Sequence, residues 1–340
     1  MTQHLNCNCG QMMHFDENLQ IWKCDYCGFS KPVYKRQVFE NFQSAYKGLL
    51  SNVLYYGNKV KVRDNEMLET IPCYFEILNP RDRLLNIKCR NDKIRKYTFG
   101  ELMWYLSGKD NLNFINKYSK QWAKLSDDGV HCNSAYGKYI FGQMLCHGDG
   151  VNYKDSGLRY SQWEWCKKQL LNDMFTRQAV IQIKPIQMYD TKDVACTYFL
   201  QFMIRNNKLD LIVGMRSNDL MFGTTYDVFM FTFLQELMAA EIGICVGTYR
   251  HFASNMHIYC KDIPKVYEIL SENETSTEEM YDIPKYFREN DLPLLLKLEN
   301  SYVEGYGIPE ENKRYIKSLS PLGKQLLSFL IGDNHESSIK

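Results

Sequence analysis

The strongest constraint on the fold is a pair of apolar runs joined by two asparagines. Residues 195–204 and 209–215 are apolar and flank Asn206-Asn207, and asparagines at this place are typical of a β-hairpin turn. A third apolar run, residues 179–188, precedes the pair. The rest of the chain mixes helical patterns with strands and shows no internal repeat, which predicts an α+β domain around one large sheet.

Several segments have the pattern of helices. Residues 97–108 are almost wholly apolar and end at Gly108, a residue that commonly terminates helices. A long apolar helix is expected over residues 228–241. Two further helical patterns, 292–303 and 311–331, have no function that the sequence indicates. The acidic stretch 271–279 is expected to be a solvated loop.

Composition limits the class of protein. The 340 residues are 45% hydrophobic, enough for a large core, and 41 basic against 40 acidic side chains give a net charge of +1. No overall basic field therefore favours nucleic acid. The chain has no apolar signal run and no uncharged apolar stretch of about 18 residues. We expect a soluble cytoplasmic protein (in the host cytoplasm if it is phage-encoded) with no membrane partner.

Four of the twelve cysteines form a separate pattern at the N-terminus. Cys7-x-Cys9 and Cys24-x-x-Cys27 have the spacing of a zinc ribbon that binds structural Zn²⁺, with His4 and His14 as bystanders. The alternatives are redox-active cysteines or a degenerate ribbon. We expect a ribbon at 1–32, a linker and helix at 33–50, and a catalytic domain at 51–340 with a divergent C-terminal helical extension. The ribbon would contact nucleic acid or a replication protein, or brace the main domain.

Four short segments carry a family resemblance. They are Glu101-Leu-Met-Trp-Tyr-Leu-x-Gly108, Ala135-Tyr136-Gly137-Lys138, Cys196-x-x-Phe-x-Gln201, and Arg216-Ser-x-Asp219 continuing to His257-Ile-Tyr259. In this order and spacing they resemble the thymidylate synthase superfamily, over roughly residues 50–262. The resemblance implies a thymidylate synthase-like fold whose large mixed sheet packs at a homodimer interface, and an enzyme that uses 5,10-methylenetetrahydrofolate.

The chemistry of the family explains why a thiol is needed. C5 of a pyrimidine becomes nucleophilic only after another group adds to C6, and a thiolate can make that addition. The resemblance gives this role to Cys196, with Arg216 near enough to favour the thiolate. The alternative is a small buried core thiol, the common fate of a lone cysteine in a strand.

The resemblance also assigns binding roles. Arg216 and Ser217 would bind the nucleotide 5′-phosphate, with Arg63 from a loop and Arg177 donated by the other subunit. Gln201 would orient the pyrimidine, and the remaining roles fall to the sugar-binding pair His257 and Tyr259, the proton-transfer residues Glu101 and Tyr136, and the folate-binding residues Asp219 (also catalytic) and Trp122. Alternatively, Arg63 and Arg177 are surface arginines, and His257 and Trp122 belong to the core.

Asp227 indicates the base. Uracil-using members of the superfamily have Asn at this position, and cytosine-using members have Asp. An amide answers both N3–H and O4 of uracil, whereas a carboxylate accepts from N4 of cytosine, and when protonated it also donates to N3. The alternative is a helix N-cap, because Asp227 precedes an apolar helix.

The chain also departs from the family pattern. Ala195, Thr197 and Gln178 replace the usual Pro, His and Arg, and residues 334–340 lack the apolar ending that closes thymidylate synthases. An open site favours addition of water over hydride transfer. We therefore expect conversion of dCMP to 5-hydroxymethyl-dCMP for modified DNA synthesis. The alternatives are a dCMP C5-methyltransferase, a CMP-using relative, or a non-catalytic nucleotide sensor.

Overall fold

The chain divides into two units, residues Met1–Gln37 and Val38–Lys340. A computed structural model describes residues 5–7, 9–16, 21–28, 30–32, 37–88, 90–142, 144–145, 159–183, 190–272, 279–302 and 307–332. Residues 334–340, part of the expected strand 179–188 and most of the acidic stretch 271–279 lie outside these ranges. The segment 33–50, expected to be a linker and helix, is split between the two units. No helix within the described ranges is long and apolar enough to cross a membrane.

The first unit is a small antiparallel sheet of four strands in the order β1-β2-β3-β4. The strands are β1 (Leu5–Asn6), β2 (Met12–Asp16), β3 (Ile21–Lys23) and β4 (Ser30–Pro32). Among the side chains that the structure describes in this unit, Cys7, Met13 and Cys24 are buried together. Units of this size commonly depend on a bound metal ion for part of their stability.

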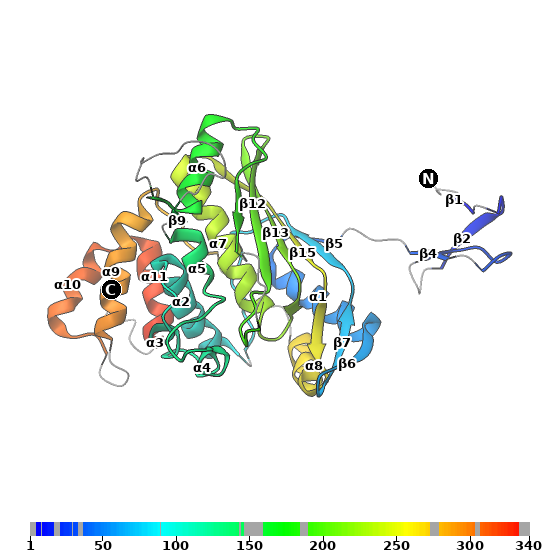
Figure 1. The fold of residues 1–340 in the computed structure, drawn as a ribbon, viewed down its shortest axis with the longest axis horizontal. Helices are drawn as coiled ribbons and strands as arrows, with labels where there is room; N and C mark the ends of the chain where they lie inside the picture. Colours follow the sequence, from blue (N-terminus) through cyan, green and yellow to red (C-terminus); the bar gives the residue numbers. More distant parts are fainter. Residues whose placement is uncertain are drawn as a thin grey trace. The chain divides into compact units, whose positions relative to one another are not determined.

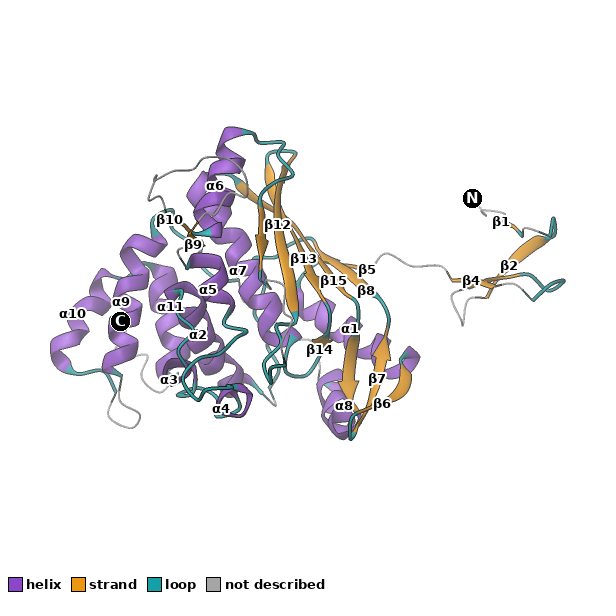
Figure 2. Ribbon diagram, in the orientation of Figure 1, coloured by secondary structure: helices purple, strands orange, loops and turns teal. Residues whose placement is uncertain are grey.

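The second unit is built on a six-stranded mixed sheet, seen in Figures 1 and 2. Its strand order is β11 (Val180–Gln182), β12 (Thr197–Arg205), β13 (Lys208–Met215), β15 (Cys245–Ala253), β8 (Cys73–Ile77) and β5 (Gln37–Phe39). β13 runs parallel to β15, and the other described pairs are antiparallel. Asn206 and Asn207 have φ of 51° and 58°, as a two-residue hairpin turn requires. The predicted hairpin and α+β fold are confirmed.

Helices cover one face of this sheet (Figure 2). α6 (Gln162–Asn172) and α7 (Thr224–Ile242) pack on its strands, and α2 (Asn91–Ser107) packs on α7. α2 ends at Gly108, whose φ of 65° is left-handed, as the sequence predicts. The other elements of this unit are α1 (Phe42–Tyr56), α3 (Leu112–Ile115), α4 (Trp122–Leu125), α5 (Tyr136–Phe141), α8 (Ile263–Ser271), β6 (Asn58–Val62), β7 (Asn65–Thr70), β9 (Met144–Leu145), β10 (Arg159–Tyr160), β14 (Asn218–Asp219) and β16 (Met256–Tyr259).

The C-terminal helices pack against α2. α9 (Phe287–Ser301) and α11 (Pro321–Ile331) pack against α2, and α10 (Lys313–Ser318) packs against α9. Glu299 of α9 accepts hydrogen bonds from Lys117 Nζ at 3.1 Å and Tyr118 Oη at 3.0 Å. These helices thus fix α2, the helix that carries Glu101.

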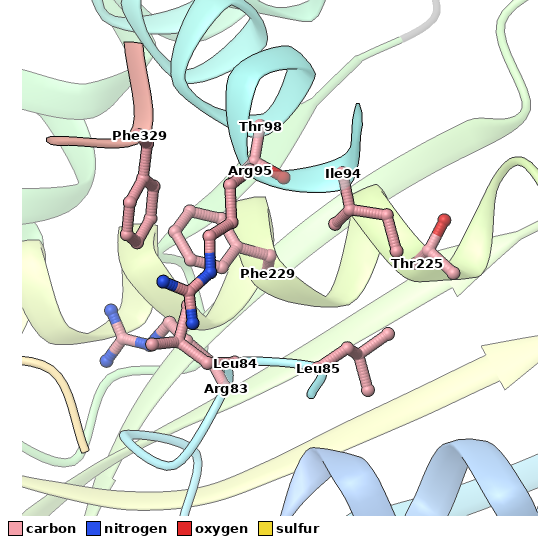
Figure 3. Close-up of a pocket in the computed structure, with 9 residues that line it drawn as sticks. All are labelled: Arg83, Leu84, Leu85, Ile94, Arg95, Thr98, Thr225, Phe229 and Phe329. Atoms are coloured by element: carbon pink, nitrogen blue, oxygen red, sulfur yellow. The ribbon is translucent and has the colours of Figure 1, made fainter. Parts of the chain in front are cut away.

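A buried ion pair lies under the same helices. Arg83 is 1% exposed and pairs with Glu236, whose other oxygen accepts from Ile283 N at 3.1 Å. Figure 3 shows a cavity beside Arg83, lined by residues 83–85 and by side chains of α2, α7 and α11. Its volume of about 10 Å³ suits one water molecule. Within the described part of the chain, Arg83 Nη1 and Thr225 Oγ1 have no hydrogen-bond partner.

Arg83→Met should lower the free energy of unfolding by about 3 kcal/mol, because the buried Glu236 carboxylate loses its closest cation. Arg81, whose Nε lies 3.3 Å from Glu236 Oε1, compensates part of the charge in the variant. Chemical denaturation measures this loss. Lys313→Met removes an exposed pair to Glu310 and should cost under about 1 kcal/mol. Equal losses in the two variants would contradict a structural role for the buried pair.

Candidate active site and cysteine cluster

Ten of the predicted site residues line one cleft of about 770 Å³ in the second unit. This volume lies in the range that holds organic ligands of moderate size. The predicted residues that line it are Arg63, Trp122, Tyr136, Cys196, Arg216, Ser217, Asp219, Asp227, His257 and Tyr259. They span residues 63–259, and three of the four quoted motifs contribute to the cleft.

Cys196 and Arg216 face each other at the open end of the β12–β13 hairpin. Thr197 pairs with Met215, and one step further out Arg216 N donates to Cys196 O at 2.8 Å. The Arg216 side chain fixes the backbone of the two residues before Cys196. Its Nε donates to Ala195 O at 3.0 Å, and its Nη2 donates to Val194 O at 2.8 Å. Three N–H groups of the guanidinium fork are left for a ligand.

Tyr136 of α5 fixes the backbone at the thiol. Its Oη accepts from the backbone N–H groups of Cys196 and Thr197, each at 3.1 Å. Burial raises the pKa of Tyr136 well above its ordinary value, so the phenol stays protonated. The Tyr136 hydroxyl therefore accepts from the backbone at Cys196 and keeps its own proton to donate to another group.

Two opposing contributions act on the pKa of the Cys196 thiol. Burial raises the pKa of Cys196. Arg216 lowers it, as expected, but burial and the carboxyls of Asp227, Asp193 and Asp219 outweigh that contribution. Formation of the thiolate therefore depends on what else enters the cleft.

Asp227 is not a helix cap, so that alternative is wrong. Gly223 is the N-cap of α7, and Asp227 lies inside the first turn. Its Oδ2 instead accepts from Asn218 Nδ2 at 2.7 Å. Burial raises the pKa of Asp227 to about 7, the Asn218 hydrogen bond opposes the rise, and Asp219 adds to it. The carboxyl thus titrates near neutral pH.

Glu101 lies behind the cleft wall and connects to it through Tyr97. Trp122 Nε1 donates to Tyr97 Oη at 3.0 Å, and Tyr97 Oη donates to Glu101 Oε1 at 3.3 Å. Glu101 Oε2 is buried and has no hydrogen-bond partner among the residues that the structure describes. Burial raises the pKa of Glu101 to about 8, and Asp227 adds to the rise. A protonated carboxyl here can store or pass a proton.

Asp219 and the pair His257 and Tyr259 also line the cleft. β14 pairs with β16 in parallel, which places Asp219 beside His257. His257 Nδ1 lies 2.8 Å from Asn255 Oδ1, and its ring contacts the Tyr259 ring edge-on at 5.2 Å between centroids. Burial lowers the pKa of His257, so the neutral ring offers one donor and one acceptor. Asp219 Oδ1 accepts from Met221 N at 2.7 Å.

Two predicted residues lie away from the cleft of their own chain. Gln201 is in the middle of β12, where its Nε2 donates to Arg177 O at 2.9 Å. Arg177 is exposed before β11. The structure therefore does not bring Gln201 to the base, because five residues of strand separate it from Cys196 by roughly 16 Å. The proposed role of Arg177 in a partner's site stays a prediction.

Two contacting residues had no predicted role. Asn218 stands between Ser217 and Asp219 in the quoted motif, and only the fold shows that its side chain meets Asp227. Tyr97 precedes Glu101 by one helical turn. This spacing places both side chains on one face of α2, so the sequence could have predicted their contact.

The four N-terminal cysteines converge on one point. Their sulfur atoms all lie within 4.8 Å of one another, with Cys7 to Cys27 at 3.5 Å and Cys9 to Cys24 at 3.6 Å. Four thiolates around Zn²⁺ at about 2.3 Å would stand about 3.8 Å apart, so the donor set fits a tetrahedral ion. Gly10 and Gly28, with φ of 84° and 72°, close the two turns. His14 instead pairs with Asp25, as a bystander would.

The α+β fold and the residues gathered in the cleft agree with the family resemblance that the sequence motifs carry. Residues 44–310 match the model of the family described as thymidylate synthase. The chain therefore belongs to the thymidylate synthase family. Thymidylate synthase A of Bacillus subtilis, a thermostable protein of known structure, shares the fold with a TM-score of 0.58 at 20% identity, over 73% of this chain and 91% of that one.

Two similar proteins come from phages. The deoxyuridylate hydroxymethyltransferase of Bacillus phage SP01 is 33% identical over 237 residues, which are 66% of this chain and 61% of that protein. The deoxyuridylate hydroxymethyltransferase of Delftia phage PhiW-14 is 28% identical over 216 residues, 59% of this chain and 56% of that protein. The chain thus spans less than two thirds of the length of either relative.

Proposed function

We propose that this protein catalyses folate-dependent C5 hydroxymethylation of dCMP to 5-hydroxymethyl-dCMP through a covalent bond between Cys196 and C6 of the base. The observation that carries the proposal is the meeting of Cys196, Arg216 and Asp227 in one cleft. A nucleophile, a cation for a phosphate and a carboxyl for a base edge are the three groups that such a reaction needs.

The residues divide the work as follows. Arg216 and Ser217 bind the 5′-phosphate, His257 and Tyr259 bind the 3′-OH, and Arg63 lies at the same cleft. These contacts hold C6 near the thiol. The cation at Arg216 favours the thiolate, and the addition of sulfur to C6 makes C5 nucleophilic. Tyr136 keeps the Cys196 backbone fixed during this step.

Proton transfers fall to the buried acids. C5 must lose its hydrogen as a proton after the new carbon–carbon bond forms, and the Glu101 carboxyl, which accepts a hydrogen bond from Tyr97, can take part in this transfer. Trp122 only donates to Tyr97 and so holds the phenol in place. Trp122, Leu125 and Asp219 line the cleft and fit an aromatic folate ring.

When bound, 5,10-methylenetetrahydrofolate would supply one carbon at the oxidation level of formaldehyde and would leave as tetrahydrofolate. One water molecule would supply the hydroxyl group, and the Cys196 sulfur would leave C6 as the C5–C6 double bond re-forms. The net change would be the gain of CH₂O by the nucleotide, with no oxidation of the folate.

Two bases are candidates for the nucleotide that binds at Asp227. Asp227 supports cytosine, because an ionised carboxylate accepts from N4 and repels O4 of uracil. Uracil is the second candidate, and the names of the two phage relatives favour it.

The working form is proposed to be a homodimer. The sheet face opposite the helices exposes Phe252, Tyr74 and Tyr198, with 38–44% of each residue accessible, and a second copy would cover it. Arg177, exposed at the end of this sheet, would complete the partner's phosphate site.

The N-terminal unit is proposed to bind one structural Zn²⁺ and to contact nucleic acid or a replication protein. Purified protein should contain about one zinc ion per chain, and a Cys24→Ala, Cys27→Ala double variant should contain almost none, as measured by elemental analysis. His14→Ala serves as the control and should keep its zinc. Equal zinc in the double variant and the control would exclude the cysteine site.

One assay separates the enzymatic candidates. The protein is incubated with dCMP or dUMP and 5,10-methylenetetrahydrofolate, while dihydrofolate absorbance and product mass are followed. Hydroxymethylation yields a product heavier by one formaldehyde unit without dihydrofolate, whereas methylation yields dihydrofolate. Binding of nucleotide with no turnover of either base would refute the enzyme and favour a nucleotide sensor.

A further inference from the structure

Three polar residues of the cleft form a hydrogen-bonded chain that ends at His257. Glu69 on β7 is the register partner of His257 on β16, so the two side chains lie on the same face of this antiparallel pair. Asn255 connects them: its Nδ2 donates to Glu69 Oε2, and its Oδ1 lies 2.8 Å from His257 Nδ1. All three residues line the cleft.

The Glu69 carboxylate sets the direction of both hydrogen bonds. A carboxylate can only accept, so Asn255 must turn its NH₂ group toward Glu69 and its carbonyl oxygen toward His257. That oxygen can also only accept, so the proton of a neutral His257 ring must be on Nδ1. The backbone of Asn255 is fixed as well, because its carbonyl oxygen accepts from Asn218 N at 2.8 Å.

The other ring nitrogen of His257 is left for a ligand. The residue is 6% exposed, and its Nε2 makes no hydrogen bond to any residue that the structure describes. Burial lowers the pKa of His257, although the carboxyls of Asp219 on β14 and Glu69 on β7 oppose the change. A neutral imidazole with its proton on Nδ1 has a lone pair on Nε2, and this nitrogen therefore accepts.

We propose that Glu69 and Asn255 are positioning residues: they hold the proton of His257 on Nδ1, so that Nε2 presents an acceptor to the cleft and selects a ligand group that donates a hydrogen bond, such as a hydroxyl. An ether, an ester or a fluorine in the same place has no proton to offer to the Nε2 lone pair. In the proposed function this group is the 3′-OH of the nucleotide. The identity of the ligand group rests on that function, whereas the position of the proton does not.

The test is nuclear magnetic resonance at pH 8 of the whole chain, labelled with ¹⁵N in the histidine rings and free of ligand. The ¹⁵N shifts distinguish a ring nitrogen that carries a proton from one that does not, and the spectrum of His257→Gln identifies the signals of residue 257. In the wild type we expect the proton on Nδ1. In Glu69→Leu the Asn255 amide is free to turn, and in Asn255→Leu the acceptor is gone, so both variants should show a large fraction with the proton on Nε2.

Glu66→Leu is the matched control for these variants. Glu66 lies on the same strand, but its carboxylate pairs with exposed Lys59 at 3.0 Å, so this variant should keep the proton of His257 on Nδ1. A wild-type spectrum with the proton on Nε2 would overturn the inference. A proton that stays on Nδ1 in Glu69→Leu and in Asn255→Leu, or in the one of them that folds, would overturn it as well.

Calorimetry without folate tests the ligand group. The affinities of dCMP and dUMP are compared with those of the same nucleotides carrying fluorine in place of the 3′-OH. Fluorine should weaken binding to the wild type by about tenfold or more, because it leaves the buried Nε2 without a donor, and binding to Glu69→Leu or Asn255→Leu by less than about threefold. Equal losses in the wild type and the variants would refute selection of a donor. Failure of the wild type to bind either natural nucleotide would refute the proposed function and leave the position of the proton as the resonance spectra give it.

Discussion

Cys196→Ser should reduce turnover by about 10⁴-fold or more while leaving nucleotide affinity within about threefold, because a serine hydroxyl at this position stays protonated and cannot add to C6. The contacts that bind the nucleotide do not involve the sulfur. Arg216 and Tyr136 hold the backbone at residue 196 through its carbonyl and N–H groups, so the variant keeps the geometry of the cleft. Single-turnover kinetics and calorimetry measure the two quantities.

A matched control distinguishes this role from a general effect of losing a thiol. Cys260 is half-buried directly after β16, and Cys260→Ser should keep full turnover. Because burial raises the pKa of Cys196, the wild-type rate should also increase with pH, as the thiolate fraction grows. Turnover that survives in Cys196→Ser would exclude covalent catalysis by this residue.

Asp227→Asn should raise the preference for dUMP over dCMP, as a ratio of kcat/KM at pH 8, by about 10²-fold or more. The N–H of Asn218 would hold the new amide oxygen as it holds Oδ2, which leaves the amide NH₂ to donate to O4 of uracil. The variant has no carboxyl to ionise, so its base preference should not change with pH. Competition assays with both nucleotides in one mixture give the ratio directly.

The matched control for this variant is another carboxyl at the same cleft. Asp193 lines it but accepts a hydrogen bond from Ser134 N at 2.7 Å through Oδ2. Asp193→Asn should therefore leave the base preference unchanged. If Asp227→Asn and Asp193→Asn shift the preference equally, or neither does, Asp227 does not read the base.

Local signals made the sheet and its hairpin predictable. Asn206-Asn207 specifies a turn by its own backbone preferences, and Gly108 ends α2 for the same reason. The C-terminal helices were also visible as patterns, although the pattern 311–331 divides into α10 and α11, because Ser320 and Pro321 begin a new helix. Their packing on α2 was not, because it depends on contacts such as Tyr118 with Glu299, which are far apart in sequence.

The site residues that belong to a sequence motif could be predicted, whereas those that are defined by a side-chain contact could not. The family frame located Cys196, Arg216 and Asp227 at one cleft, but it also placed Gln201 there, although that residue lies far along the strand. The contact between Asn218 and Asp227 was invisible because neither residue type specifies a partner. The net effect of burial on the Cys196 pKa likewise required the fold, since the sequence showed only the opposing arginine.

The most direct test of the covalent bond uses nucleotides with fluorine at C5, because fluorine cannot leave as a proton and the adduct remains attached. The protein is incubated with 5-fluoro-dCMP or 5-fluoro-dUMP and 5,10-methylenetetrahydrofolate, denatured, and weighed intact by mass spectrometry. We expect a mass increase that includes one nucleotide and maps to the peptide containing Cys196. An unmodified mass with both analogues, under conditions where the nucleotide binds, would contradict the proposed mechanism.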